Sequence, residues 1–75
     1  MGYEWDENKR LPNLVKHKLD FRDTPLVFKN LHMVLPTKYV GEERFLAVSF
    51  IKNLFVTVVY TYRGENIRVI SFRRA

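Results

Sequence analysis

The sequence contains no cysteine, so neither disulfide bonds nor thiolate metal sites can hold the fold together. Only two histidines are present, 15 positions apart, and their spacing resembles no zinc-binding pattern. The three glycines stand isolated at positions 2, 41 and 64, which excludes the glycine-rich loops that bind nucleotides. We therefore expect neither a metal site nor a cofactor.

Long apolar runs are absent as well. No stretch of about 18 apolar residues occurs, and the N-terminus, MGYEWDENKR, lacks the apolar middle region of a signal peptide. We expect no membrane contact and a cytoplasmic location, which agrees with the lack of cysteine. At 75 residues the chain has room for one domain, whose core removes only about 60% of the unfolded surface from water.

Basic residues outnumber acidic residues. Thirteen Lys and Arg against eight Asp and Glu give a net charge of +5. Residues 31–75 carry seven basic and three acidic side chains, whereas residues 1–30 carry six and five. This basic second half favours a nucleic acid or an acidic protein as partner, through long-range attraction.

The second half is rich in β-branched and aromatic residues between positions 45 and 74. Turn signals at Lys52-Asn53 and Gly64-Glu65-Asn66 divide this stretch into three consecutive antiparallel strands. Three arginines on the last strand could bind a polyanionic partner. They could also be solvated charges that keep an edge strand from pairing with other chains. The periodicity of the strand does not distinguish these two interpretations. Strict alternation predicts one face with Ile67, Val69, Ser71 and Arg73, and the other with Arg68, Ile70, Phe72 and Arg74.

The first half predicts a short strand at 2–5 and an amphipathic helix at about 7–18 with Asp6 as its N-cap. Pro12 predicts a kink or a later start in that helix. A second helix is expected at 25–30, then a strand at 31–35 ended by Pro36, and a polar loop at 36–43. The predicted class is α+β, with two N-terminal helices packed on a mainly antiparallel sheet of four to five strands.

The polar residues favour chemistry on a phosphodiester. RNA is cleaved without a metal when a base activates the 2′-hydroxyl, cations stabilise the dianion and an acid protonates the leaving oxygen. Histidine is the usual proton-transfer group near neutral pH, and arginine matches phosphate oxygens with its fork of donors. His17 can instead complement a helix end, and the helix lysines can be solvated charges. The candidates are His17, Lys9, Lys16, Arg44, Arg68 and Arg73.

Three blocks carry a family resemblance: W-D-E-N-K-R-x-x-N-L-x-K-H at 5–17, G-E-E-R-F at 41–45, and Y-x-x-R-G-x-x-I-R-V-I-S-x-R-R-A at 60–75. Together they resemble the BrnT toxin family over nearly the whole chain. The resemblance implies a RelE-like fold, one BrnT-like domain over residues 1–75, and a metal-independent endoribonuclease toxin of a type II toxin–antitoxin pair. The implied partners are RNA and a BrnA-like ribbon-helix-helix antitoxin, which would make the DNA contacts.

The family's polar positions can be carried over residue by residue. The sequence departs from the family pattern at Pro12, where a helix former is usual, and at Lys18, where glycine usually ends the helix. The chain also stops at Ala75, without the family's C-terminal helix, so a truncated, non-catalytic module that binds RNA or antitoxin is the alternative function. The matching positions are Asp6, Lys9, Asn13, Lys16, His17, Glu43, Arg44, Arg68, Ser71 and Arg73. Expected catalytic residues are His17, Arg44, Arg68 and Arg73, and expected RNA-binding residues are Lys9, Lys16 and Arg74.

Overall fold

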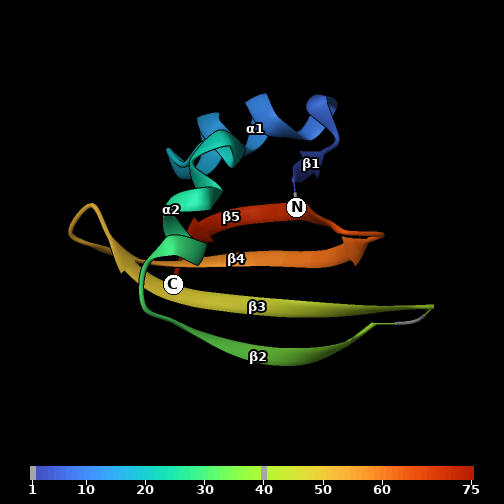
Figure 1. Ribbon diagram of the computed structural model, residues 1–75. Coiled ribbons are helices and arrows are strands. Elements are labelled where there is room, and N and C mark those ends of the chain that lie inside the picture. Colours follow the sequence, from blue (N-terminus) through green and yellow to red (C-terminus); the bar gives the residue numbers. More distant parts are fainter. Residues whose placement is uncertain (1, 40) are drawn as a thin grey trace.

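One five-stranded sheet forms the framework of the computed structural model, which describes residues 2–39 and 41–75 (Figure 1). Its spatial order is β1-β5-β4-β3-β2. The strands are β1 (Tyr3–Trp5), β2 (His32–Tyr39), β3 (Glu42–Ile51), β4 (Leu54–Arg63) and β5 (Asn66–Arg74). Helices α1 (Glu7–His17) and α2 (Thr24–Lys29) follow β1, with a 3-10 turn at Phe21–Asp23 between them.

The sheet is mixed, because β1 pairs with β5 in parallel while the other three pairings are antiparallel. The α+β class was predicted correctly. The prediction of a mainly antiparallel sheet with two N-terminal helices needs correction, since the sheet is mixed and a strand precedes both helices. A three-residue strand is too short for its periodicity to reveal its neighbour or its direction.

The three-stranded meander forms with both predicted turns. Lys52 and Asn53 join β3 to β4 with φ of 51° and 63°, the left-handed pair that a two-residue hairpin turn requires. β2, however, runs through Pro36, so the predicted strand end and most of the predicted loop at 36–43 are wrong; residue 40 of that loop lies outside the described residues. Proline is tolerated because β2 is an edge strand, where a backbone nitrogen that faces away from the sheet needs no hydrogen.

Helix α1 begins at Glu7 and runs through Pro12 to His17, so the predicted late start is wrong. Asp6 caps it as predicted, accepting the backbone N–H of Asn8 at 3.0 Å. Lys18 ends it in the left-handed conformation, with φ of 62°, and donates its backbone N–H to the carbonyl of Leu14 at 2.8 Å. Two residues unfavourable for helix geometry are thus accommodated, which requires that tertiary contacts hold α1 in place.

A β-bulge in β5 changes which side chains share a face. The β4–β5 pairing is regular up to Val59 opposite Ser71, and then Tyr60 lies opposite Val69, so that Ile70 is the extra residue. Directly opposed residues point to the same side of a sheet. The strict alternation predicted for β5 is therefore wrong: Val69 and Phe72 share the buried face, while Arg68, Ser71 and Arg73 share the other.

The hydrophobic core lies between the helices and one face of the sheet. α2 crosses this face, and α1 lies beyond β5 at the edge (Figure 1). The largest fully buried side chains include Tyr60, Phe21 and Phe72, and Trp5 packs edge-on against Phe21 with ring centroids 6.3 Å apart. The opposite face, here called the open face, carries the alternate residues of each strand. No helix in the described part of the chain is long and apolar enough to cross a membrane.

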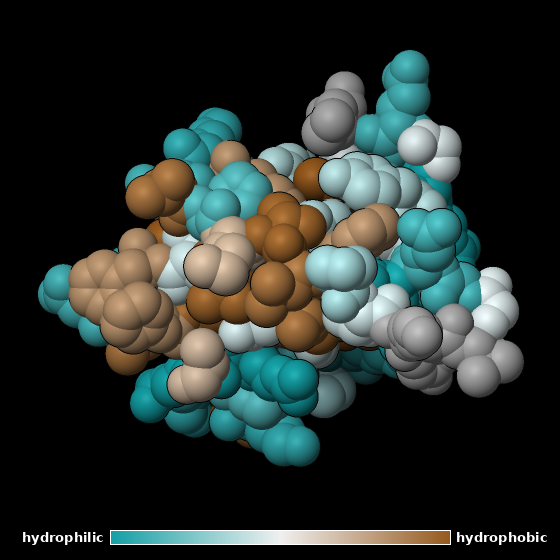
Figure 2. Space-filling view, turned by 90° about the horizontal axis from the view of Figure 1, so that it is seen from below, coloured by the Kyte–Doolittle hydropathy of each residue, from teal (hydrophilic) through white to brown (hydrophobic). Residues whose placement is uncertain are grey.

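Apolar side chains also gather outside the core, along the β2 edge of the sheet (Figure 2). β2 and the residue before it contribute four of them, and the β3–β4 hairpin contributes two phenylalanines whose rings lie 4.8 Å apart. All six are exposed, which leaves an apolar surface outside the core. This β2 patch consists of Leu31, Met33, Val34, Leu35, Phe50 and Phe55.

Candidate functional site

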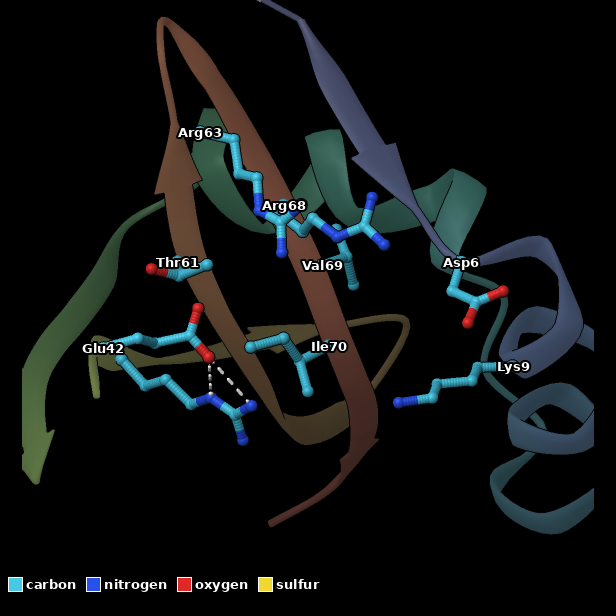
Figure 3. A pocket seen from close by; sticks show the side chains of 9 residues that line it. Asp6, Lys9, Glu42, Thr61, Arg63, Arg68, Val69 and Ile70 are labelled. Atoms are coloured by element: carbon cyan, nitrogen blue, oxygen red, sulfur yellow. Dashed lines mark hydrogen bonds and ion pairs between the residues drawn. The ribbon is translucent and has the colours of Figure 1, made fainter. Parts of the chain in front are cut away.

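A pocket of about 130 Å³ lies on the open face, where β4, β5 and the start of β3 meet the N-terminus of α1 (Figure 3). Four cations and two carboxylates line it, so the pocket is net positive. Thr61, Val69 and Ile70 complete its wall. The charged residues of this cationic pocket are Lys9, Arg44, Arg63, Arg68, Asp6 and Glu42.

Local structure explains why these side chains converge. Thr61 and Arg63 are two residues apart on β4 and share a face, and Arg68 lies opposite Thr61 on β5. Lys9 lies in the first turn of α1 and points toward β5 and its bulge residue Ile70 (Figure 3). The site therefore depends on the β5 bulge and on how α1 is fastened beside it.

Ion pairs orient two of the four cations. Arg44 donates from both Nε and Nη2 to Oε2 of Glu42, each at 2.9 Å. Nη1 of Arg68 lies 3.5 Å from Oε2 of Glu4, a looser contact. Lys9 and Arg63 make no ion pair with a described residue, so their charge is available to a ligand. An anion entering the pocket would meet oriented guanidinium groups and two uncommitted cations.

A second hollow, of about 370 Å³, lies at the other end of α1, where β5 ends. Its lining contains only basic residues, and none of them makes an ion pair with a described residue. His17 is eight residues from Lys9, which corresponds to roughly 12 Å along the helix axis. The residues of this second hollow are Lys16, His17, Lys18, Arg73 and Arg74.

The predicted site residues thus divide into two groups. The structure brings Lys9, Arg44 and Arg68 together in the cationic pocket, and Lys16, His17, Arg73 and Arg74 together in the second hollow. Sequence reasoning missed Glu42 and Arg63. Glu42 shares a face with Arg44 because the two are two residues apart on a strand, and this spacing could have distinguished it from Glu43.

Asn13, one of the family's polar positions, fastens α1 to the sheet. Its side-chain amide donates to the carbonyls of Phe72 at 2.7 Å and Leu19 at 3.0 Å, and its oxygen accepts the N–H of Phe72 at 3.3 Å. β1 covers the β5 edge only as far as Val69. Asn13 supplies hydrogen bonds to the next part of that edge, as a neighbouring strand would.

Arg10 holds the N-terminal part of α1 in place. It donates to Glu7 at 2.8 Å and to Asp20 at 3.1 Å, which links the helix to the segment before the 3-10 turn. Burial raises the pKa of the Asp20 carboxyl, but hydrogen bonds from the backbone and side chain of Arg22 and from Arg10 outweigh this and lower the pKa overall. Hydrogen bonds from Trp5 and Arg10 lower the pKa of Glu7. These contacts hold the turn that presents Lys9.

The fold and the site define a small α+β protein with a net cationic pocket on the open face of a mixed sheet. Residues 5–75 match the family model described as ribonuclease toxin, BrnT, of type II toxin-antitoxin system, and the chain belongs to this family. It is also similar to the 1.1 Å crystal structure of the Brucella abortus ribonuclease toxin, BrnT, with a TM-score of 0.84 and 38% sequence identity over 100% of this chain and 96% of that chain. No curated protein matches the sequence significantly. The resemblance inferred from the three sequence blocks is confirmed.

Proposed function

We propose that this BrnT-family toxin is an endoribonuclease that cleaves RNA without a metal ion and holds the scissile phosphate in the cationic pocket. The observation that carries the proposal is the convergence of four cations from α1, β3, β4 and β5 on one pocket that also contains carboxylates. Arginine is suited to phosphate because its planar fork can bind two oxygens at once. The family description and the name of the Brucella protein support RNA as the substrate.

The chemistry requires a base and an acid on opposite sides of the phosphorus atom. Glu42 and Lys9 extend into the pocket from opposite sides (Figure 3). Glu42 accepts the proton of the 2′-hydroxyl, whose oxygen then attacks phosphorus. The 5′-oxygen leaves with a proton from Lys9, giving a 2′,3′-cyclic phosphate and a 5′-hydroxyl. Arg44 and Arg68 stabilise the dianion that forms between these events.

The second hollow binds a neighbouring phosphate of the same strand. It lies along the same two elements, α1 and β5, as the cationic pocket. Arg68 and Arg73 lie opposite Thr61 and Thr57, which are four residues apart on β4, about 13 Å, and the bulge leaves both arginines on the open face. We therefore assign RNA binding to Lys16, His17, Arg73 and Arg74, and proton transfer to groups in the pocket.

Membership of a type II toxin–antitoxin family implies an antitoxin partner. We propose that this partner is a BrnA-like protein encoded beside the toxin, that it supplies any contact with DNA, and that both act in the cytoplasm.

Cleavage of a single-stranded RNA oligonucleotide tests the enzymatic proposal. In the presence of a chelator, the purified protein should release fragments that end in a 2′,3′-cyclic phosphate, and Arg68→Ala should slow their release by about 10²- to 10³-fold. Lys29→Ala is the matched control, because Lys29 is an exposed cation outside both basic sites. RNA that binds the folded protein but remains intact would support the non-catalytic alternative.

A further inference from the structure

We propose that the β2 patch is the docking surface for the antitoxin, and that the docked segment of the antitoxin continues across the open face into the cationic pocket. The segment combines large apolar side chains for the patch with carboxylates for the pocket. This inference rests on the proposed function for the identity of the partner and of the pocket. The patch itself is an independent observation.

The β2 patch is unusual for a chain of this size. Leu31 is 96% exposed, Phe55 64% and Met33 63%. Between β2 and the β3–β4 hairpin lies a groove of about 510 Å³ whose lining includes these three residues together with Val48 and Phe50. Monomeric proteins rarely expose a contiguous apolar surface of this kind unless it binds a partner. No Lys or Arg lines the groove, so a phosphate backbone is a poor match for it.

The edge position of β2 determines how a partner can attach. An edge strand leaves backbone groups unpaired along its outer side, and these invite another strand. Pro36, in the middle of β2, has no N–H and interrupts any such ladder. Met33 and Leu35 point to the open face, whereas Val34 points to the core face. Side chains inserted into the groove therefore provide the anchor, as in the docking of amphipathic segments.

Strand β3 connects the patch to the cationic pocket. Alternate residues of β3 point to the open face, running from Arg44 through Leu46 and Val48 to Phe50. Six residues of strand span about 20 Å, a distance that six extended residues or roughly 13 helical residues of a partner cover. A segment of that length reaches from the groove to the four cations. Its carboxylates would then occupy the phosphate position, which explains inhibition as direct exclusion of RNA.

Charge favours the antitoxin over a second copy of this chain. Two copies, each with a net charge of +5, repel each other over long range and bring no excess of carboxylates to the pocket. An acidic partner gains attraction at the pocket and apolar burial at the patch. The β2 patch and the cationic pocket together therefore fit one ligand that carries both large apolar side chains and carboxylates.

The test uses purified toxin and the protein encoded by the adjacent reading frame, with affinity measured by calorimetry. Met33→Glu and Phe55→Glu should each weaken binding by roughly 30-fold or more, as loss of an interface hot spot does. Val15→Glu is the matched control, since Val15 is 69% exposed on α1, away from β2, and it should bind as the wild type does. All three variants should cleave RNA at the wild-type rate, which also shows that they are folded.

A second arm tests the extension into the pocket. A 2′-O-methyl RNA oligonucleotide, which cannot be cleaved, should compete with the neighbouring protein for the toxin. Wild-type affinity in both patch variants would contradict docking on the β2 patch. Simultaneous binding of the RNA and the neighbouring protein would contradict the extension into the cationic pocket. A free toxin that dimerises through Met33, measured by light scattering, would assign the patch to a second copy instead. If the wild-type toxin does not bind the neighbouring protein, the inference fails, while RNA cleavage still tests the enzymatic proposal separately.

Discussion

The side chain of Asn13 bonds to both backbone groups of Phe72, donating to its carbonyl at 2.7 Å and accepting its N–H at 3.3 Å. One side chain thereby supplies hydrogen-bond partners to backbone groups on the part of the β5 edge that the short strand β1 does not reach. The same contact sets the position of α1, whose first turn carries Lys9 into the cationic pocket and whose last turn carries His17 into the second hollow. A structural residue thus aligns both basic sites.

Asn13→Ala should therefore destabilise the protein. The substitution leaves partly buried backbone groups of Phe72 and Leu19 without partners, and such losses typically cost about 1–3 kcal/mol. Urea denaturation should show the lower free energy of unfolding. Asn8→Ala is the control, because Asn8 is exposed and only its backbone is used in capping. Equal stability of both variants would show that α1 is held elsewhere.

Pro12→Ala should stabilise the protein, because Pro12 lies inside a continuous helix. Proline there removes a backbone hydrogen bond and crowds the preceding turn, at a cost of up to about 3 kcal/mol. The thermal unfolding midpoint should rise, while RNA binding should not change, since Pro12 lines neither basic site. A lower midpoint would indicate that α1 needs the proline for its packing.

Much of the fold could be predicted because its signals are local. The Lys52-Asn53 turn and the Asp6 cap each depend on residues close in sequence, and both are present. The errors arise where tertiary context decides. Pro36 fits within β2 only because that strand is at the sheet edge, and the bulge at Ile70 depends on pairing with β4.

The site was partly predictable for the same reason. Arg44 and Arg68 could be selected by residue type, but their meeting in one pocket depends on the register between strands. The bulge then puts Arg73 on the same face as Arg68, which alternation alone would not allow. Which β5 residues His17 lies near is set by how α1 is placed beside β5, and no local pattern encodes that arrangement.

Alkaline pH should destabilise the protein through Tyr60. Burial raises the pKa of Tyr60 to about 12 from 10.0, with further contributions from Tyr62, so the folded state holds this proton more tightly than the unfolded state does. The associated stability is complete below pH 10 and is lost as the pH rises toward 12. Unfolding midpoints measured between pH 8 and 12 should fall less steeply for Tyr60→Phe. Parallel curves for the two proteins would rule out this origin.

The second hollow should affect RNA affinity through salt-dependent contacts. Each phosphate contact with a single strand contributes about 0.7 to the slope of log affinity against log salt concentration. Arg73→Ala and Arg74→Ala should each lower the slope by up to this amount, whereas Lys29→Ala should leave it unchanged. Filter binding of a 2′-O-methyl RNA oligonucleotide over a range of salt concentrations measures the slopes. If the slopes of both variants equal that of the wild type, the second hollow does not contact RNA phosphates.

Catalysis should depend on the geometry of the guanidinium groups as well as on their charge. Arg44→Ala and Arg68→Ala should each lower kcat by about 10²- to 10³-fold, as loss of one oriented donor to a developing oxyanion does. Arg68→Lys should be nearly as slow, because a point charge cannot bind two phosphate oxygens in one plane. Arg73→Ala should instead raise KM with little change in kcat, since its contact is the same in substrate and transition state.

The pH dependence of the cleavage rate shows which of the two basic sites carries out proton transfer. If Glu42 is the base, Glu42→Gln should lower kcat by about 10²- to 10⁴-fold and remove the acidic limb of the pH–rate profile. His17→Ala should keep the shape of that profile, because His17 lies roughly 12 Å along α1 from Lys9 and outside the pocket. A profile that loses a limb near neutral pH in His17→Ala, with Glu42→Gln fully active, would move the chemistry to the second hollow. Full activity of both Arg44→Ala and Arg68→Ala would exclude the cationic pocket as the place where the phosphate is held.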